Sequence, residues 1–95
     1  MALREIASAC ASTAVTMAVT NMVADMVVMF GDDAQKLRYL PSINDGTFAA
    51  AAFALSEPGY GSDAGGLQCK AERSEDGGHY TLTGTKMWIT SGDVA

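Results

Sequence analysis

The chain has 95 residues, 48% hydrophobic and 18% charged, so it is long enough for one small domain at most. With 11 acidic and 6 basic residues its formal net charge is −5, which argues against nucleic-acid binding and against an anionic membrane surface. Cys10 and Cys69 show neither CxxC nor Cys/His spacing, so we expect free thiols in a reducing, cytosol-like compartment.

A long apolar stretch occupies residues 9–30 and has about the length of a bilayer-crossing helix. We expect no membrane span, because threonines interrupt the stretch and Asp25 would carry a carboxylate into the bilayer. A signal peptide is not expected either, since Arg4 is offset by Glu5 and the stretch is too long and too polar.

One face of this stretch is predicted to be a helical stripe packed in the core. Its residues recur at spacings of three and four, which is the period of an α-helix. The helix is predicted to end at Gly31, since glycine is favoured just beyond a helix. The stripe consists of Val15, Val19, Met22, Met26 and Met29.

A second, shorter helix is predicted to follow. Asp32 or Asp33 supplies the side-chain oxygen that caps its first turn. Leu37 and Leu40 are expected to face inward, and Pro41 is expected to end the helix.

The alanine-rich run 47–55 is predicted to be a buried strand or an extended segment. Alanine favours helix, so this prediction goes against local propensity. It rests on the length of the run and on Pro58, which keeps Glu57 out of the helical region.

Three further strands are predicted in the glycine-rich second half. Residues 66–73 and 79–83 form a hairpin joined by the polar loop 74–78. Residues 86–90 form another strand after the turn at Gly84.

Few side chains in the sequence suggest catalysis on their own. His79 is the single histidine and lies beside the predicted hairpin turn, so we expect it on the surface and not in a Ser-His-Asp triad. Without a second histidine, no metal site is predicted. The glycines of 59–64 and 84–86 match neither a dinucleotide fingerprint nor a phosphate loop.

Two segments, 55–63 and 84–92, could bind a ligand. Their glycines let backbone amides approach it, Ser56 and Ser62 offer hydroxyls, and Trp88 offers a flat apolar face. These residues alone leave two interpretations open, a structural turn beside an aromatic strand and a cofactor site.

A family resemblance favours the cofactor site. FALSEPGYGSD at 53–63, followed by TGTKMWIT at 83–90, resembles the flavin-binding signature of the acyl-CoA dehydrogenases. FGDDAQK at 30–36 and YLP at 39–41 resemble the helices that precede this signature. The resemblance therefore covers essentially the whole chain.

The resemblance implies an α+β fold, with N-terminal helices followed by an incomplete antiparallel β-domain. Residues 1–45 correspond to the end of an all-helical domain, and residues 46–95 to the first half of a middle β-domain. Both ends are expected to be cut from a larger acyl-CoA dehydrogenase-like fold.

The resemblance also implies a binding site for FAD. Phe53, Leu55 and Ser56 are expected to line the isoalloxazine ring, with the Ser56 hydroxyl near its pyrimidine edge. Donors there would stabilise the negative charge of the reduced ring. Trp88 is expected to pack against the ring, and Ile89 to contribute a backbone contact.

Further residues take their expected roles from the same resemblance. Thr90 places a hydroxyl near flavin N5, and Gly61 and Ser62 lie near the cofactor, with Ser62 also near the thioester substrate. Tyr60 stands where the family usually has a small residue, so it either narrows the acyl pocket or faces solvent.

Two charged residues of the signature are expected to have structural roles. Glu57 is expected to stabilise the loop by hydrogen bonds and not to act in catalysis. Lys86 is expected to be solvated or in a salt bridge.

The expected function is that of a fragment of an FAD-dependent acyl-CoA dehydrogenase of fatty acid metabolism. The α-proton of an acyl-CoA thioester goes to a glutamate outside this chain and the β-hydride goes to flavin N5, so the chain alone is expected to be inactive. An electron-transfer flavoprotein, a homotetramer and a cytoplasmic or mitochondrial-matrix location are implied. The alternatives are a related flavin monooxygenase or acyl-CoA oxidase, and a non-catalytic binding or interaction domain.

Overall fold

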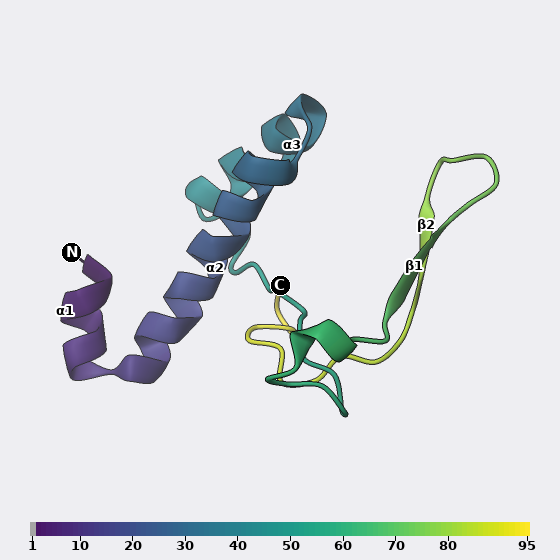
Figure 1. The fold of residues 1–95 in the computed structure, drawn as a ribbon. Coiled ribbons are helices and arrows are strands. Elements are labelled where there is room, and N and C mark those ends of the chain that lie inside the picture. Colours follow the sequence, from purple (N-terminus) through teal and green to yellow (C-terminus); the bar gives the residue numbers. More distant parts are fainter. Residues whose placement is uncertain (1) are drawn as a thin grey trace. The chain divides into compact units, whose positions relative to one another are not determined.

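The computed structural model describes residues 2–95, which form helices followed by a two-stranded sheet (Figure 1). This arrangement confirms the predicted α+β class. The residues divide into two compact units, Met1–Phe53 with Thr90–Ala95, and Ala54–Ile89. The elements are α1 (Ala2–Ala9), α2 (Ala11–Phe30), α3 (Asp33–Asn44), the 3₁₀ turn η1 (Ala64–Gly66), β1 (Lys70–Arg73) and β2 (Tyr80–Thr83).

A break at Cys10 separates α1 from α2 (Figure 1). Cys10 adopts an extended conformation, with φ −151° and ψ 105°. Its N–H still donates to the Ile6 carbonyl at 2.8 Å, and its carbonyl accepts from the Ala14 N–H at 3.2 Å. Neither proline nor glycine marks this position, so the break could not be predicted from the sequence.

The end of α2 at Phe30 agrees with the prediction. Gly31 has φ −72°, so it is not needed for a left-handed conformation. Its N–H donates to the Val27 carbonyl at 2.9 Å, and a Cβ at this position would lie 2.6 Å from the same oxygen. Glycine is therefore favoured here by a close approach to the last turn of the helix.

The predicted core stripe of α2 is largely uncovered. Val15 is 56% exposed and Met29 is 69% exposed, whereas Val19 and Met22 are half-buried. The helices that pack on α2 in residues 2–95 are α1 and α3, and Ala14 is the buried hydrophobic residue of this part of the chain. The stripe does consist of apolar residues on α2, but α1 and α3 do not cover it.

By length and composition, α2 is also able to cross a membrane. Core helices of soluble proteins meet the same criterion. The carboxylate of Asp25 lies within the helix, and such a group is costly in a bilayer.

A capping box begins α3, and Asp32 is its N-cap. The Asp32 carboxylate accepts from the Gln35 N–H at 2.8 Å, and the Gln35 side-chain oxygen accepts from the Asp32 N–H at 3.0 Å. Of the two aspartates proposed for this role, the structure selects Asp32.

The predicted end of α3 at Pro41 is wrong, because the helix continues to Asn44. Pro41 has no N–H donor, but its carbonyl still accepts from the Asp45 N–H at 2.9 Å, which continues the helix beyond it. The inward position of Leu37 is also wrong, since Leu37 is 78% exposed, whereas Leu40 is half-buried.

The run 47–55 forms no strand and is not buried. Its larger side chains, Phe48 and Phe53, are 45% and 39% exposed. One hydrogen bond ties it to α2, from the Ala51 N–H to Thr20 Oγ1 at 3.3 Å. The run remains irregular chain because no strand of the described residues pairs with it.

The hairpin is confirmed, with strands shorter than predicted. β1 and β2 are antiparallel, with Lys70 opposite Thr83 and Arg73 opposite Tyr80. The expected strand at 86–90 does not form. Trp88 interrupts the extended conformation there, with φ 60°.

The capping box yields a prediction about stability. Asp32→Ala should lower the free energy of unfolding by about 1 kcal/mol, because the Gln35 N–H loses its acceptor. Urea unfolding of the protein that carries these residues measures the loss. Asp33→Ala is the control, since it removes the same charge from the same turn without removing the cap. Equal losses in both variants would contradict the prediction.

Candidate functional site

Glu57 forms the centre of the unit Ala54–Ile89. Its side chain is 6% exposed, and it is the buried charged residue of residues 2–95. One carboxylate oxygen accepts from the Gln68 N–H at 2.7 Å. The other accepts from the Cys69 N–H and from Lys86 Nζ, each at 2.9 Å. The expected structural role of Glu57 as a hydrogen-bonding group fits these contacts.

Lys86 connects the two signature segments. Besides the ion pair with Glu57, its Nζ donates to the Leu55 carbonyl at 2.8 Å. Next to this bridge, the Met87 N–H donates to the Ser56 carbonyl at 2.9 Å. Two adjacent residues of the second segment thus hold two adjacent residues of the first.

The same contacts lower the pKa of Glu57 to about 2, from an ordinary value of 4.5. The hydrogen bond from the Gln68 N–H is the largest cause, followed by the one from Lys86, while burial acts in the opposite direction. Glu57 is therefore an anion near neutral pH, which suits an acceptor of hydrogen bonds and not a proton carrier.

Tyr60 closes the turn that begins at Glu57. The backbone N–H of each residue donates to the carbonyl of the other, at 3.0 and 3.1 Å. The Tyr60 ring lies where a Cβ on Gly66 would be, and its hydroxyl lies 3.1 Å from Gln68 Nε2, which donates to it. Tyr60 is half-buried and braces the loop, a role that neither proposed alternative for it included.

Gly84 allows a second close approach in this unit. It has φ +150°, and a Cβ there would lie 2.8 Å from Cys69 Sγ and 2.9 Å from Cys69 Cα. This glycine lets the chain that leads to Lys86 pass directly against residue 69, whose N–H binds Glu57.

The predicted flavin residues fall into both units. Phe53 and Thr90 belong to the first unit, at positions where the chain enters and leaves the second. In the second unit, the bond between Met87 and Ser56 brings the two signature segments together. The predicted residues of this unit are Leu55, Ser56, Gly61, Ser62, Trp88 and Ile89.

Trp88 has an unusual conformation for a tryptophan. Its φ of 60° lies in the left-handed region, and its side chain is 85% exposed. Such a conformation is costly for a bulky residue and persists where the neighbouring structure imposes it. An exposed indole can cover the apolar part of a planar ligand.

The donor set of the second unit fits a flavin. Ser56, which carries a hydroxyl, is half-buried, and its carbonyl takes part in the join of the two segments. The space where a Cβ on Gly59 or Gly61 would lie is open, so a ligand can approach the backbone there. Hydrogen-bonding groups and an exposed aromatic face are the features that a flavin ring requires.

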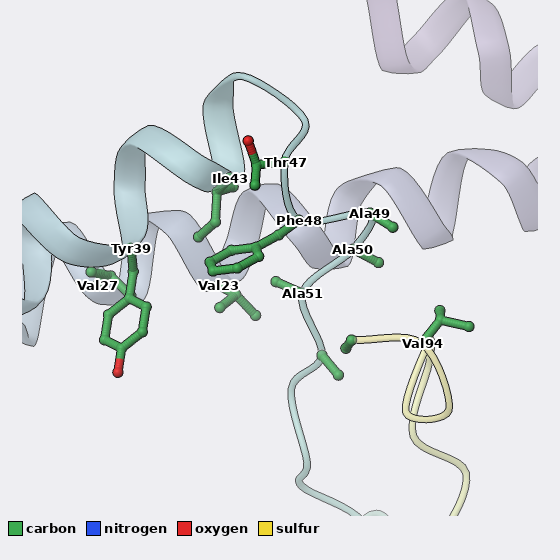
Figure 2. A pocket seen from close by; sticks show the side chains of 12 residues that line it. Val23, Val27, Tyr39, Ile43, Thr47, Phe48, Ala49, Ala50, Ala51 and Val94 are labelled. Carbon is green, nitrogen blue, oxygen red and sulfur yellow. The ribbon is translucent and has the colours of Figure 1, made fainter.

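A separate apolar hollow of about 650 Å³ lies in the first unit (Figure 2). It contains none of the predicted flavin residues. The residues that α2 contributes to it, Val23 and Val27, are not part of the predicted stripe, and the part played by the run 47–52 could not be read from the sequence. The hollow is lined by Val23, Val27, Tyr39, Ile43, Thr47, Phe48, Ala49, Ala50, Ala51, Ala52, Val94 and Ala95.

His79 is a surface residue of the hairpin loop, as predicted. Its side chain is 68% exposed, and its Nδ1 lies 3.9 Å from an Asp76 oxygen. Ser74 Oγ donates to the same carboxylate at 2.6 Å, and so the three side chains do not form the chain of hydrogen bonds of a catalytic triad.

Comparison with known proteins places the chain in a family. Residues 1–47 match the model of the acyl-CoA dehydrogenase N-terminal domain, and residues 52–95 match that of the acyl-CoA dehydrogenase middle domain. The chain therefore belongs to the acyl-CoA dehydrogenase family, which confirms the resemblance seen in the signature.

Individual relatives agree with the family models. The mitochondrial isovaleryl-CoA dehydrogenase of Oryza sativa is 42% identical over 96 residues, which cover 100% of this chain and 23% of the relative. Butyryl-CoA dehydrogenase from Megasphaera elsdenii is 40% identical, with a TM-score of 0.88 over 99% of this chain and 24% of that one. An acyl-CoA dehydrogenase from Bacillus anthracis, solved in complex with FAD, is 46% identical, with a TM-score of 0.67 over 73% of this chain and 12% of that one.

The lowered pKa of Glu57 predicts a pH dependence of stability. The ionised carboxylate contributes stability that is fully present above 4.5 and is lost as the pH falls from 4.5 through about 2. Glu57→Gln should therefore lose more stability at neutral pH than at about pH 3, as measured by urea unfolding at both values. Glu72→Gln, on exposed β1, is the control and should show little loss at either pH. A Glu57→Gln loss that is the same at both pH values would contradict the prediction.

The close approach at Gly84 predicts a second effect on stability. Gly84→Ala should destabilise the protein by more than about 1 kcal/mol, because the new Cβ meets Cys69 and the φ of +150° is unfavourable for alanine. Gly59→Ala is the matched control, since nothing lies within 4 Å of its Cβ position. Thermal unfolding compares the two, and equal melting temperatures would show that the contact with Cys69 does not matter.

Proposed function

We propose that this chain is part of an FAD-dependent acyl-CoA dehydrogenase and supplies one side of its flavin site. The hydrogen bond from the Met87 N–H to the Ser56 carbonyl carries the proposal, because it joins the two halves of the flavin signature. Membership of the family and the FAD complex of the Bacillus anthracis relative support it.

In this proposal Leu55, Ser56, Trp88 and Ile89 contact the isoalloxazine ring. The Ser56 hydroxyl donates a hydrogen bond to the pyrimidine edge, and the exposed Trp88 indole packs on the ring. The bound FAD supplies the acceptor for the hydride removed from the substrate. Phe53 adds apolar contact to the ring.

The remaining proposed contacts concern the edges of the site. Thr90 brings its hydroxyl toward flavin N5, and Gly61 and Ser62 lie near the cofactor. Ser62 is also proposed to contact the thioester substrate. Both Gly61 and Ser62 are exposed, so they are accessible to a ligand.

The proposal extends to the larger protein. The chain spans 23% of the rice relative and 24% of the Megasphaera relative. We propose that the rest of the machinery, including the base, lies outside this chain. We propose residues 1–45 as the end of a helical domain and 46–95 as the start of the β-domain. The proposed partners are an acyl-CoA, an electron-transfer flavoprotein and further copies in a tetramer, in the cytoplasm or the mitochondrial matrix.

The function is tested on the protein that carries these residues. It should be yellow, with the absorbance bands of FAD, and an acyl-CoA should bleach these bands in the absence of oxygen. A colourless protein that is indifferent to added FAD would contradict the proposal. Rapid oxygen consumption with acyl-CoA would instead identify an oxidase or monooxygenase of the same fold.

The Ser56 hydroxyl predicts the behaviour of two variants. Ser56→Ala should weaken FAD binding or slow flavin reduction by roughly tenfold, the usual effect of removing one hydrogen bond to a charged group. Ser56→Thr keeps a hydroxyl at the same position and should stay within about threefold of the parent protein. Fluorescence titration with FAD and stopped-flow reduction measure both effects. Equal losses in the two variants would show that the hydroxyl is not the donor.

A further inference from the structure

Lys86 lies between the side chain of Glu57 and the backbone of Leu55, the residues on either side of Ser56. Its Nζ lies 2.9 Å from Glu57 Oε1 and 2.8 Å from the Leu55 carbonyl oxygen. Ser56 lies between these two partners in the chain. The ammonium group therefore spans Ser56 and holds the backbone carbonyl of Leu55 before it and the side-chain carboxylate of Glu57 after it.

The second segment is held at the same place. Met87, the residue after Lys86, donates its N–H to the Ser56 carbonyl at 2.9 Å. Trp88 comes next, with φ 60° and an 85% exposed side chain. The left-handed Trp88 therefore directly follows two residues that are held by contacts with the first segment.

The bridge is also buried more deeply than an ordinary surface ion pair. The side chains of Lys86 and Glu57 are 23% and 6% exposed. Removing one member of such a pair leaves the other charge poorly compensated, whereas many exposed pairs contribute little. The position of Leu55 and Ser56 therefore depends on this ammonium group.

We propose that Lys86 is a positioning residue, which sets the places of Ser56 and Trp88 against the flavin through its bridge from the Glu57 carboxylate to the Leu55 carbonyl. This inference rests on the proposed function. Lys86 itself touches neither cofactor nor substrate in this scheme, and its effect passes through the backbone of the two segments.

The test is Lys86→Met in the flavin-containing protein. Methionine keeps much of the apolar stem and lacks the ammonium group. We expect kcat to fall by about tenfold or more while KM for the acyl-CoA changes less than about threefold, because misplaced groups slow the reaction without removing substrate contacts. The flavin absorbance bands should shift, since Ser56 and Trp88 move relative to the ring. Lys86→Arg keeps a positive charge with several N–H donors, and it should recover part of kcat.

The matched control is Lys70→Met, which removes an exposed lysine from β1 of the same unit. It should leave kcat and the flavin bands unchanged. Lys86→Met with kcat and bands equal to those of Lys70→Met would overturn the proposal, even if its melting temperature is lower. Equal losses in Lys86→Arg and Lys86→Met would also overturn it.

A second readout does not require the flavin. Amide hydrogen exchange in Lys86→Met should accelerate in peptides that cover residues 55–58 and 84–90, and not in those that cover α3. Unchanged exchange there would overturn the inference. If the parent protein binds no FAD, the proposed function fails, whereas this exchange experiment still reports on the bridge.

Should Lys86→Met not fold, Glu57→Gln is measured in the same way, and unchanged exchange in that variant would overturn the inference as well.

Discussion

The second unit depends on one buried carboxylate. Glu57 cannot be removed from water without donors, and it finds them at Gln68, Cys69 and Lys86. These partners lie 11, 12 and 29 residues further along the chain. A single charge therefore ties the turn after residue 55, the entry to the hairpin and the second signature segment together.

The first unit is held in a different way. Its helices contact one another through α2, and no large side chain of residues 2–95 is fully buried. Met29, Phe30 and Leu37 remain 69 to 78% exposed. Burying apolar side chains is the dominant favourable contribution to folding. Packing against these three exposed side chains would therefore stabilise the first unit. The polar contacts of the second unit contrast with this open apolar surface.

Local chemistry made parts of the fold predictable. Asp32 and Gly31 act within one turn of the chain, and the hairpin loop is defined by its own polar residues. The strand predicted at 86–90 did not form, nor did the buried strand that was one of the two alternatives for 47–55, because a strand requires a partner, and partners are not encoded locally. Pro41 was misjudged because a proline removes one donor and does not always end a helix.

The sequence by itself determined the family and the α+β class, since the signature at 53–63 and 83–90 is a linear pattern, and it predicted which residues contact the flavin. It also identified Glu57 as a structural residue. Only the tertiary structure decided that Lys86 bridges Glu57 and Leu55, that Tyr60 packs on Gly66, and that Trp88 is left-handed and exposed. The reason is physical: the Lys86 bridge and the packing of Tyr60 are contacts between residues that the linear pattern does not pair, and the φ of Trp88 is a backbone conformation that residue type does not specify.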